Sequence, residues 1–396
     1  MAGRITAPLA RLWMGRWRNE QADVHGVAEA LNVSRRRAYQ LRTSYLASCA
    51  AGSQKQWQPG SSGGDHQACW PEEVLALVHK LLSADPPANY ALVASEVHRR
   101  CAHRVHRASI RRYALDKGLA PPKPRIAKTR AGTRRWQRQN IGELWQLDST
   151  PHPWFGSEEP SCHLLNMLDD CTRLNTGAQL YERETLLSYL DFLPRAFLEH
   201  QLPLELYVDY HSIFFTHDPE SLTQLGRALR FYEVNFRYAP TPEAKGKIER
   251  YHQFWQGRLP TLFAEGGINE VAPANKLLEK LRSHHNFHDI HRELGSSAET
   301  AWNTAGAQKR CVLRAVPKCS WWPFIWSVRT PARVAEDRTI TLGQQRIRVD
   351  LPKGKRVVRC QHPDGNYTVL ASEPDKSKHP EVILRLGPAI IYPWSN

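Results

Sequence analysis

A change of periodicity near residue 141 limits the folds that this chain can adopt. From there to residue 256, apolar runs of five to eight residues alternate with longer amphipathic stretches. Strands and helices in the resulting order predict an α/β domain, a mixed sheet of five strands flanked by helices. The expected elements are strands at 144–148, 162–169 and 174–181, a helix at 184–200, a strand at 204–209, a helix at 219–231, a strand at 234–238 and a helix at 244–256.

Basic residues are concentrated ahead of this domain. Residues 1–140 hold 24 Lys and Arg against 9 Asp and Glu, whereas the remaining 256 residues hold 30 of each. The net charge of +15 therefore lies in the first third of the chain, which predicts an N-terminal region that binds a polyanion. No apolar run approaches the roughly 20 residues that a membrane span needs, so we expect a cytoplasmic protein without membrane contact.

Two all-α helix-turn-helix units are predicted in the basic region. In the first, Val27–Leu41 is typical of a helix, a tight turn and a second helix that Ser34 caps. The second unit repeats a capped basic helix at Arg107–Tyr113. Because such a helix enters the major groove, its basic and amide side chains are placed for phosphates and base edges. The candidate DNA contacts are Arg35, Arg36, Arg37, Tyr39 and Arg42 in the first unit, and Arg107, Ser109, Arg111 and Arg112 in the second.

Three carboxylates occupy related positions in the predicted α/β domain. Asp148 and Asp209 each end a predicted strand, and Glu249 lies at the start of the last helix. Neighbouring strands can place the two aspartates side by side, and a helix packed on the sheet can bring Glu249 to them. Hard oxygen ligands of this kind suit Mg²⁺. A single Asp at a strand end is usually a cap or turn residue, but three carboxylates in this order favour a metal site.

These residues also carry a resemblance. Leu147-Asp148, Tyr207-Val208-Asp209 and Lys245-Gly246-Lys247-Ile248-Glu249-Arg250, in this order of elements, resemble the catalytic core of the retroviral-integrase superfamily. Bacterial insertion-sequence transposases and the phage Mu transposase are most similar, over about residues 25–300. The resemblance implies a ribonuclease-H-like core and a DDE transposase, in which Asp148, Asp209 and Glu249 hold two Mg²⁺ ions, with Mn²⁺ as a substitute. Lys245, Lys247 and Arg250 beside this site are predicted to contact phosphates.

The implied reaction is nicking of the 3′ ends of a mobile element and transfer of those ends to target DNA. The implied partners are double-stranded DNA, as terminal repeats and as target, and further copies of the chain in a homo-oligomer on paired ends, at the bacterial nucleoid. One alternative is a domesticated, catalytically inactive DNA-binding regulator derived from a transposase. Another, a nuclease acting on RNA–DNA hybrids, shares the fold but is disfavoured by the flanking DNA-binding units.

Two histidine-containing segments admit other roles. The spacing of His98, Cys101, His103 and His106 matches no common zinc pattern, and helices of a DNA-binding unit are favoured there. For His284–His291 a structural role or a DNA contact is favoured over a metal site. The expected parts of the chain are a helix-turn-helix unit (1–47), a flexible linker (48–69), a second helix-turn-helix unit (70–120), a basic linker (121–140), the catalytic core (141–265), a helical extension (266–325), a small β-barrel (330–372) and a tail of unknown role (373–396).

Overall fold

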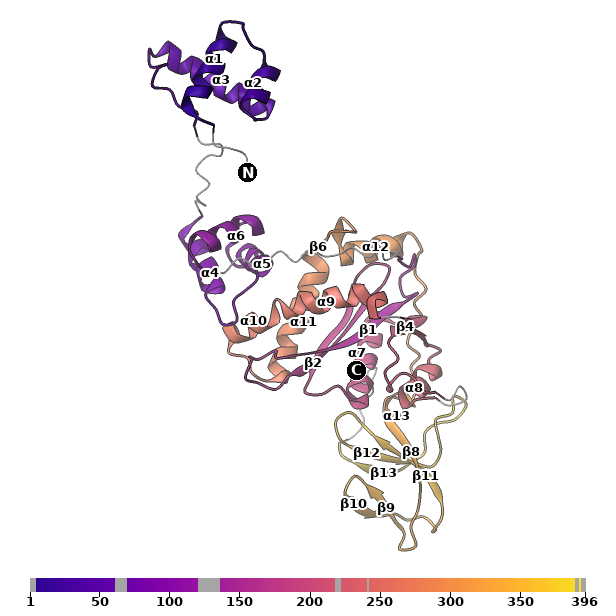
Figure 1. The fold of residues 1–396 in the computed structure, drawn as a ribbon. Coiled ribbons are helices and arrows are strands. Elements are labelled where there is room, and N and C mark those ends of the chain that lie inside the picture. Colours follow the sequence, from indigo (N-terminus) through magenta and orange to yellow (C-terminus); the bar gives the residue numbers. More distant parts are fainter. Residues whose placement is uncertain are drawn as a thin grey trace. The chain divides into compact units, whose positions relative to one another are not determined.

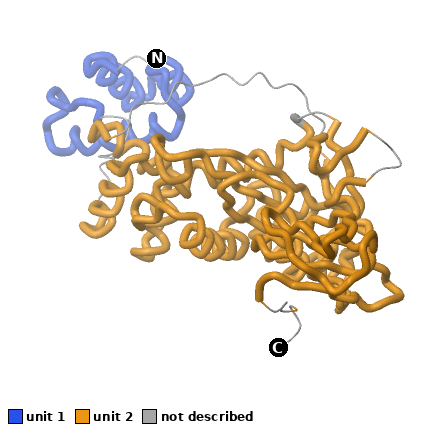
Figure 2. Tube along the Cα trace, turned by 90° about the horizontal axis from the view of Figure 1, so that it is seen from below, with its two compact units in different colours: residues 1–69 blue, residues 70–396 orange. Residues whose placement is uncertain are grey.

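The computed structural model of the chain describes residues 5–60, 70–119, 136–217, 222–240, 242–388 and 392 (Figure 1). The chain divides into two compact units, residues 1–69 and residues 70–396 (Figure 2). The predicted linkers over 48–69 and 121–140 and the predicted tail over 373–396 fall in part outside the described residues. None of the described helices is both long enough and apolar enough to cross a membrane.

The first unit is a bundle of three helices with the predicted cap. Ser34 accepts a hydrogen bond from the backbone N–H of Arg37 at 3.3 Å and so begins the third helix. Trp57 is buried against the bundle, and its indole N–H donates to Ser44 at 3.0 Å. Residues 48–57 therefore belong to the bundle rather than to the predicted linker. The helices are α1 (Ala7–Arg18), α2 (Val24–Ala30) and α3 (Arg35–Ala50).

The second helical unit is packed on the rest of residues 70–396. Arg100 forms an ion pair with Glu265 at 2.6 Å, and the Thr261 hydroxyl donates to the carbonyl of Pro86 at 3.0 Å. Leu262 is buried in the apolar core of the three-helix bundle. The bundle is therefore fixed to the helix that begins at Leu259. These elements are α4 (Glu72–Leu82), α5 (Tyr90–Cys101), α6 (Arg107–Asp116) and α10 (Leu259–Gly266).

A five-stranded sheet forms the centre of residues 70–396 and confirms the predicted mixed sheet. Its order is β3-β2-β1-β4-β5, with β1, β2 and β3 antiparallel and with β4 and β5 parallel to β1. Because side chains alternate along a strand, Trp145 and Leu147 pack towards α7, whereas Asp148 lies on the face covered by α9. The elements are β1 (Trp145–His152), β2 (Cys162–Asp169), β3 (Asn175–Tyr181), α7 (Leu186–His200), β4 (Glu205–Val208), α8 (Gln224–Phe231), β5 (Asn235–Tyr238), η1 (Pro242–Lys245) and α9 (Gly246–Gln256).

Helix α11 (Val271–His288) lies along the outer edge of β3. The amide of Asn275 accepts from the backbone N–H of Leu180 at 2.7 Å and donates to its carbonyl at 2.9 Å. Asn286 makes the same pair of bonds with the backbone of Asn175, at 2.9 and 3.0 Å. Side-chain amides on a helix thus satisfy edge groups that a further strand would otherwise bind.

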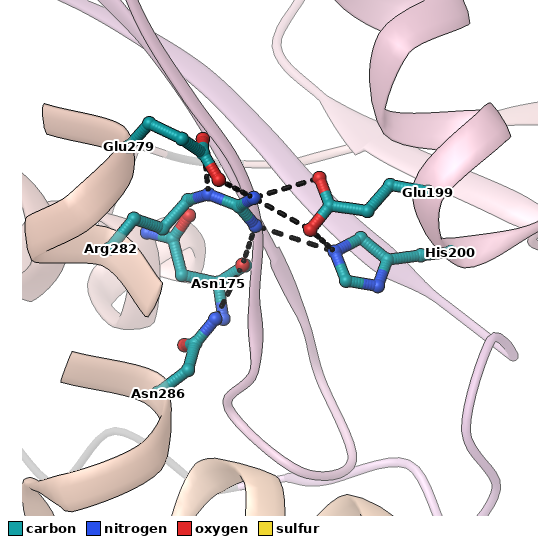
Figure 3. Close-up of polar contacts among 6 residues, drawn as sticks. All are labelled: Asn175, Glu199, His200, Glu279, Arg282 and Asn286. Carbon is teal, nitrogen blue, oxygen red and sulfur yellow. Dashed lines mark hydrogen bonds and ion pairs between the residues drawn. The ribbon is translucent and has the colours of Figure 1, made fainter. Parts of the chain in front are cut away.

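Arg282 joins α11 to both β3 and α7 (Figure 3). Its guanidinium is almost fully buried and donates to the carbonyl of Asn175 at 2.9 Å. Carboxylate oxygens of Glu199 and Glu279 each accept from it at 2.7 Å, and Nε2 of His200 lies 3.3 Å away. One buried cation therefore ties three elements together.

The C-terminal region is not the closed barrel that we predicted, within the residues that the structure describes. Four strands form an open sheet in the order β13-β12-β11-β8, and β9 and β10 form a separate ribbon. One face, through Val358 and Leu370, packs into the core that contains α7, and the other, through Val357 and Val369, packs on the ribbon. Both faces are therefore covered without closure of the sheet. These strands are β8 (Val328–Arg333), β9 (Thr339–Leu342), β10 (Gln345–Arg348), β11 (Arg356–Gln361), β12 (Tyr367–Leu370) and β13 (Val382–Leu386).

The predicted helical extension contains both helices and a short ribbon. Besides α11, its elements are β6 (Ile290–His291), β7 (Ser296–Ser297), α12 (Ala298–Ala307) and α13 (Trp322–Ile325).

Candidate active site

Strand register brings Asp148 and Asp209 to the same level of the sheet. Gln146 of β1 pairs with Tyr207 of β4, and both strands run in the same direction. Two residues further along each strand lie Asp148 and Asp209. Contrary to our prediction, Asp148 does not end its strand, because β1 continues to His152 in its pairing with β2.

Helix α9 presents a row of polar side chains to this face of β1. Lys245 immediately precedes the helix and donates to Oδ1 of Asp148 at 2.7 Å. Further along, Nδ1 of His252 lies 3.7 Å from Oδ2 of Asp148, and Gln256 donates to the Thr150 hydroxyl at 3.0 Å. Asp148 is therefore contacted by two side chains about two helical turns apart, Lys245 just before α9 and His252 within it.

The ammonium of Lys245 lies between the two aspartates. Its Nζ is 2.7 Å from Asp148 and 3.8 Å from Oδ2 of Asp209, and Lys245 is only 4% exposed. Burial raises the pKa of Asp148, an effect that Lys245 opposes and Asp209 reinforces. The geometry defines one cation position shared by both carboxylates. We predicted a phosphate contact for Lys245, and in this structure its ammonium is committed to Asp148.

His252 is a site residue that the sequence did not single out. The helical pattern puts it on the same face of the helix as Glu249, without assigning it a role, and in the structure it is buried against Asp148. Burial, together with Lys245, lowers the pKa of His252 to about 4, so the imidazole is neutral at pH 7. Its Nε2 is buried and has no hydrogen-bond partner among the described residues. The seven-residue spacing from Lys245, two helical turns, is the signal that could have found it.

Glu249 lies on α9 between Lys245 and His252 but does not join the aspartates. Its side chain is exposed, and no hydrogen bond or ion pair engages it within the described ranges. Nor do three or more His, Cys, Asp or Glu side chains gather as a metal site in the described part of the chain. With 3.6 residues per turn, position 249 is nevertheless on the same stripe of the helix as His252 and Gln256.

The other two predicted phosphate contacts near this site are also paired. Lys247 donates to Asp170 at 2.5 Å, and Arg250 is exposed but forms an ion pair with Glu293 at 3.1 Å. Asp170 is fully buried and also accepts from the backbone N–H of Arg138 at 2.8 Å. This bonding indicates a structural role for Asp170.

The predicted DNA-contacting residues of α3 and α6 differ in accessibility. Arg37 and Arg42 of α3 are partly buried; Arg37 donates to the carbonyl of Gly60 at 2.5 Å, and Arg42 stacks 4.7 Å from the centre of the Trp17 ring. Ser109 of α6 is likewise partly buried. Both helices therefore present part of the predicted set to solvent. The exposed residues are Arg35, Arg36 and Tyr39 on α3, and Arg107, Arg111 and Arg112 on α6.

Part of this chain is similar in sequence to known proteins. No family model matches it. A transposase for insertion sequence IS1202 from Streptococcus pneumoniae is 32% identical over 151 residues, which are 36% of this chain and 32% of that protein. A protein of Sinorhizobium fredii named as a putative transposase, y4bF, is 28% identical over 204 residues, 48% of this chain and 44% of its own length. The chain thus resembles insertion-sequence transposases, as predicted, and spans less than half the length of these relatives.

Two solved structures are similar at low identity. The catalytic core domain of HTLV-2 integrase in complex with magnesium matches with a TM-score of 0.33 and 14% identity, over 40% of this chain and 95% of that one. A simian T-cell lymphotropic virus intasome in complex with PP2A regulatory subunit B56 gamma matches with a TM-score of 0.38 and 10% identity, over 74% and 99% of the two chains. TM-scores of this size carry no further conclusion.

Proposed function

We propose that this chain is a DNA transposase that nicks the 3′ ends of a mobile element and joins them to target DNA with divalent metal ions. The observation that carries the proposal is the shared cation position of Asp148 and Asp209 on the face of the sheet covered by α9. Glu249 on α9 is the proposed third ligand. Similarity to insertion-sequence transposases supports the same class of reaction.

The side chains at this position suit Mg²⁺, with Mn²⁺ as a substitute. Asp148 and Asp209 offer hard carboxylate oxygens, and a positive charge already lies within 2.7 and 3.8 Å of them. Asp209 is half-exposed and would bind an ion from the solvent side, while the partly buried Asp148 fixes its inner position. Two bound ions would supply an activated oxygen nucleophile and stabilise the leaving oxygen. Lys245 holds the two carboxylates together until an ion replaces it, and Glu249 is free to turn towards them.

The proposal is tested by a strand-transfer assay. The full chain is incubated with DNA carrying the terminal repeats of the element, target DNA, and Mg²⁺ or Mn²⁺. Nicked 3′ ends and joined products are expected, from a homo-oligomer assembled on paired ends. Binding of the ends without any cleavage in either metal would contradict the proposed reaction.

One observation favours a second function, a DNA-binding regulator without catalytic activity. Glu249 is not held near the aspartates, and a buried lysine occupies the cation position. A regulator would bind the element ends through α3 and α6 and leave them intact. The strand-transfer assay therefore separates the two functions directly.

Replacing Lys245 with methionine is expected to raise the affinity of the DNA-free protein for Mn²⁺ by roughly tenfold or more. The ammonium repels an ion that enters between Asp148 and Asp209, and at about 4 Å this repulsion is worth several kcal/mol even at an intermediate dielectric constant. Isothermal titration with Mn²⁺ measures the change. Lys353→Met, at an exposed lysine of the C-terminal region, is the control. Unchanged or weaker binding by Lys245→Met would show that no ion enters there.

Replacing Arg35 and Arg36 with glutamine is expected to weaken binding to duplex ends. Both side chains are exposed at the start of α3, where they are available to phosphates. If each contacts one phosphate, the slope of log Kobs against log salt concentration falls by about 2. Fluorescence anisotropy over a salt series measures it, with the exposed Arg18→Gln of α1 as control. An unchanged slope would exclude this end of α3 from the contact.

A further inference from the structure

A cleft of about 960 Å³ lies between α5 and the helices α9 and α11. It is separate from the shared cation position of Asp148 and Asp209, neither of which lines it. Its lining includes four arginines and five histidines against a single acidic residue, Asp289. We call it the basic cleft.

The charge of the basic cleft is only partly neutralised by the protein. Asp289 is paired with His285 at 2.8 Å, and Arg99 is paired with the buried Glu96 at 2.5 Å. The side chains of the remaining three arginines have no ion pair or hydrogen bond among the described residues; they are Arg104, Arg258 and Arg292. Such an excess of positive charge favours an anionic ligand.

Arg258 is the best-positioned of these cations. Its guanidinium lies over the ring of Phe254, 3.7 Å from the ring centre, and His285 covers the same ring at a centroid distance of 4.2 Å. Phe254 is therefore already covered and holds Arg258 in place, instead of offering a free face to a base. Burial lowers the pKa of the Arg258 guanidinium. A ligand that places a negative charge beside this guanidinium is therefore favoured.

Histidines of α11 and of the strand that follows it add donors of the same kind. His284 and His288 lie on α11 with ring centroids 4.5 Å apart, and His291 follows in β6. Imidazole and guanidinium groups are the donors that phosphate oxygens accept. The cleft therefore combines fixed positive charge with several hydrogen-bond donors.

We infer that the basic cleft binds the phosphodiester backbone of the DNA strand that the site beside Asp148 processes. The inference rests on the proposed function, because it assigns a second contact to the same substrate. Arg258 follows Glu249 by nine residues, roughly 13 Å along a helix. At 3.4 Å per nucleotide, this distance corresponds to about four nucleotides from the phosphate that is cut. Because nine residues also turn half way around a helix, the strand passes around α9 as well as along it and reaches the cleft after at least that length.

The test measures binding by the full chain without metal, so that it does not depend on cleavage. Arg104→Gln and Arg258→Gln are each titrated against a fluorescent duplex carrying one element end, in EDTA and over a salt series. Each is expected to weaken binding roughly tenfold and to reduce the salt slope by about 0.9. Arg195→Gln on α7, outside the cleft, is the control and is expected to match the unmodified chain.

The outcomes are distinct. Unchanged affinity and slope in Arg104→Gln overturn the inference, and this variant decides if Arg258→Gln folds poorly, because Arg104 is exposed and unpaired within the described ranges. Titration with inorganic phosphate alone tests whether the cleft binds a free phosphate ion instead of the phosphates of DNA. Phosphate binding that is lost in both variants while DNA binding is retained would assign the cleft to a free anion and overturn the DNA contact. A chain that shows the expected losses but never cuts DNA would support the cleft and contradict the proposed reaction.

Discussion

Asparagine in place of Asp148 is expected to lower metal-dependent nicking and strand transfer by about a thousandfold or more. The substitution keeps the shape and one hydrogen-bond acceptor for Lys245 but removes the charge of the partly buried carboxylate at the shared cation position. An ion that stabilises charge in the transition state is worth several kcal/mol, and each 1.36 kcal/mol is a factor of ten in rate. Single-turnover cleavage of labelled element ends in Mg²⁺ measures the loss, with end binding expected to persist.

Glu159→Gln is the matched control, since it removes an exposed carboxylate from the loop that follows β1. It is expected to cleave like the unmodified chain. Because Lys245 keeps only Asp209 as a charged partner in the Asp148→Asn protein, the thermal unfolding of that protein is measured as well. A folded Asp148→Asn protein that still cuts DNA at the normal rate would remove Asp148 from the proposed metal ligands.

Replacing Arg282 with methionine is expected to lower the free energy of unfolding by roughly 3 kcal/mol. Removing one partner of a buried ion pair costs about 3–5 kcal/mol. Here the lower end applies, because Glu199 and Glu279 are about half-exposed and regain water when the guanidinium is lost. The carbonyl of Asn175 still has the amide of Asn286. Urea titration followed by tryptophan fluorescence measures the change.

Arg195→Met is the control for this loss. Arg195 pairs with Asp191 one helical turn away at 2.7 Å, but its side chain is 64% exposed, so less than about 1 kcal/mol is expected. Equal losses in the two variants would show that burial of Arg282 contributes nothing.

The Arg282 cluster also predicts a pH dependence of stability. Burial raises the pKa of Glu199, but hydrogen bonds from His200 and Arg282 outweigh it and lower the pKa to about 2. A carboxylate with a depressed folded-state pKa stabilises the protein above its unfolded pKa of about 4.3. That stabilisation is lost as the pH falls towards 2, and Arg282→Met should reduce the dependence, while the hydrogen bond from His200 retains part of it. Urea titrations of both proteins between roughly pH 2 and pH 6, a range that spans the folded and the unfolded pKa of Glu199, measure the dependence.

The sequence predicted the order of elements in the sheet because strand and helix periodicities are local properties. It also predicted that Asp148 and Asp209 lie close together, because neighbouring parallel strands align residues that follow similar apolar runs. It did not find the role of Lys245, whose charge on a basic helix favoured a DNA contact. Which carboxylate meets that ammonium depends on how α9 packs across β1, and this packing joins residues 97 positions apart.

Two other errors have the same origin. His252 was given no role at the site, because its contact with Asp148 depends on how α9 packs across β1. The C-terminal strands alternate as barrel strands do, and alternation does not reveal that the core around α7 covers one face. Contacts between distant segments decided each case.

The side-chain amides that Asn275 and Asn286 place along β3 limit how copies of this chain can join. A strand from a neighbouring molecule would find the backbone groups of Leu180 and Asn175 already occupied. Lateral extension of the sheet from that side, the route to runaway self-association, is therefore blocked. At the opposite side, β5 offers only four residues. Copies of this chain are therefore expected to associate through surfaces other than the β3 edge of this sheet, and not by extending it into a continuous sheet from that side.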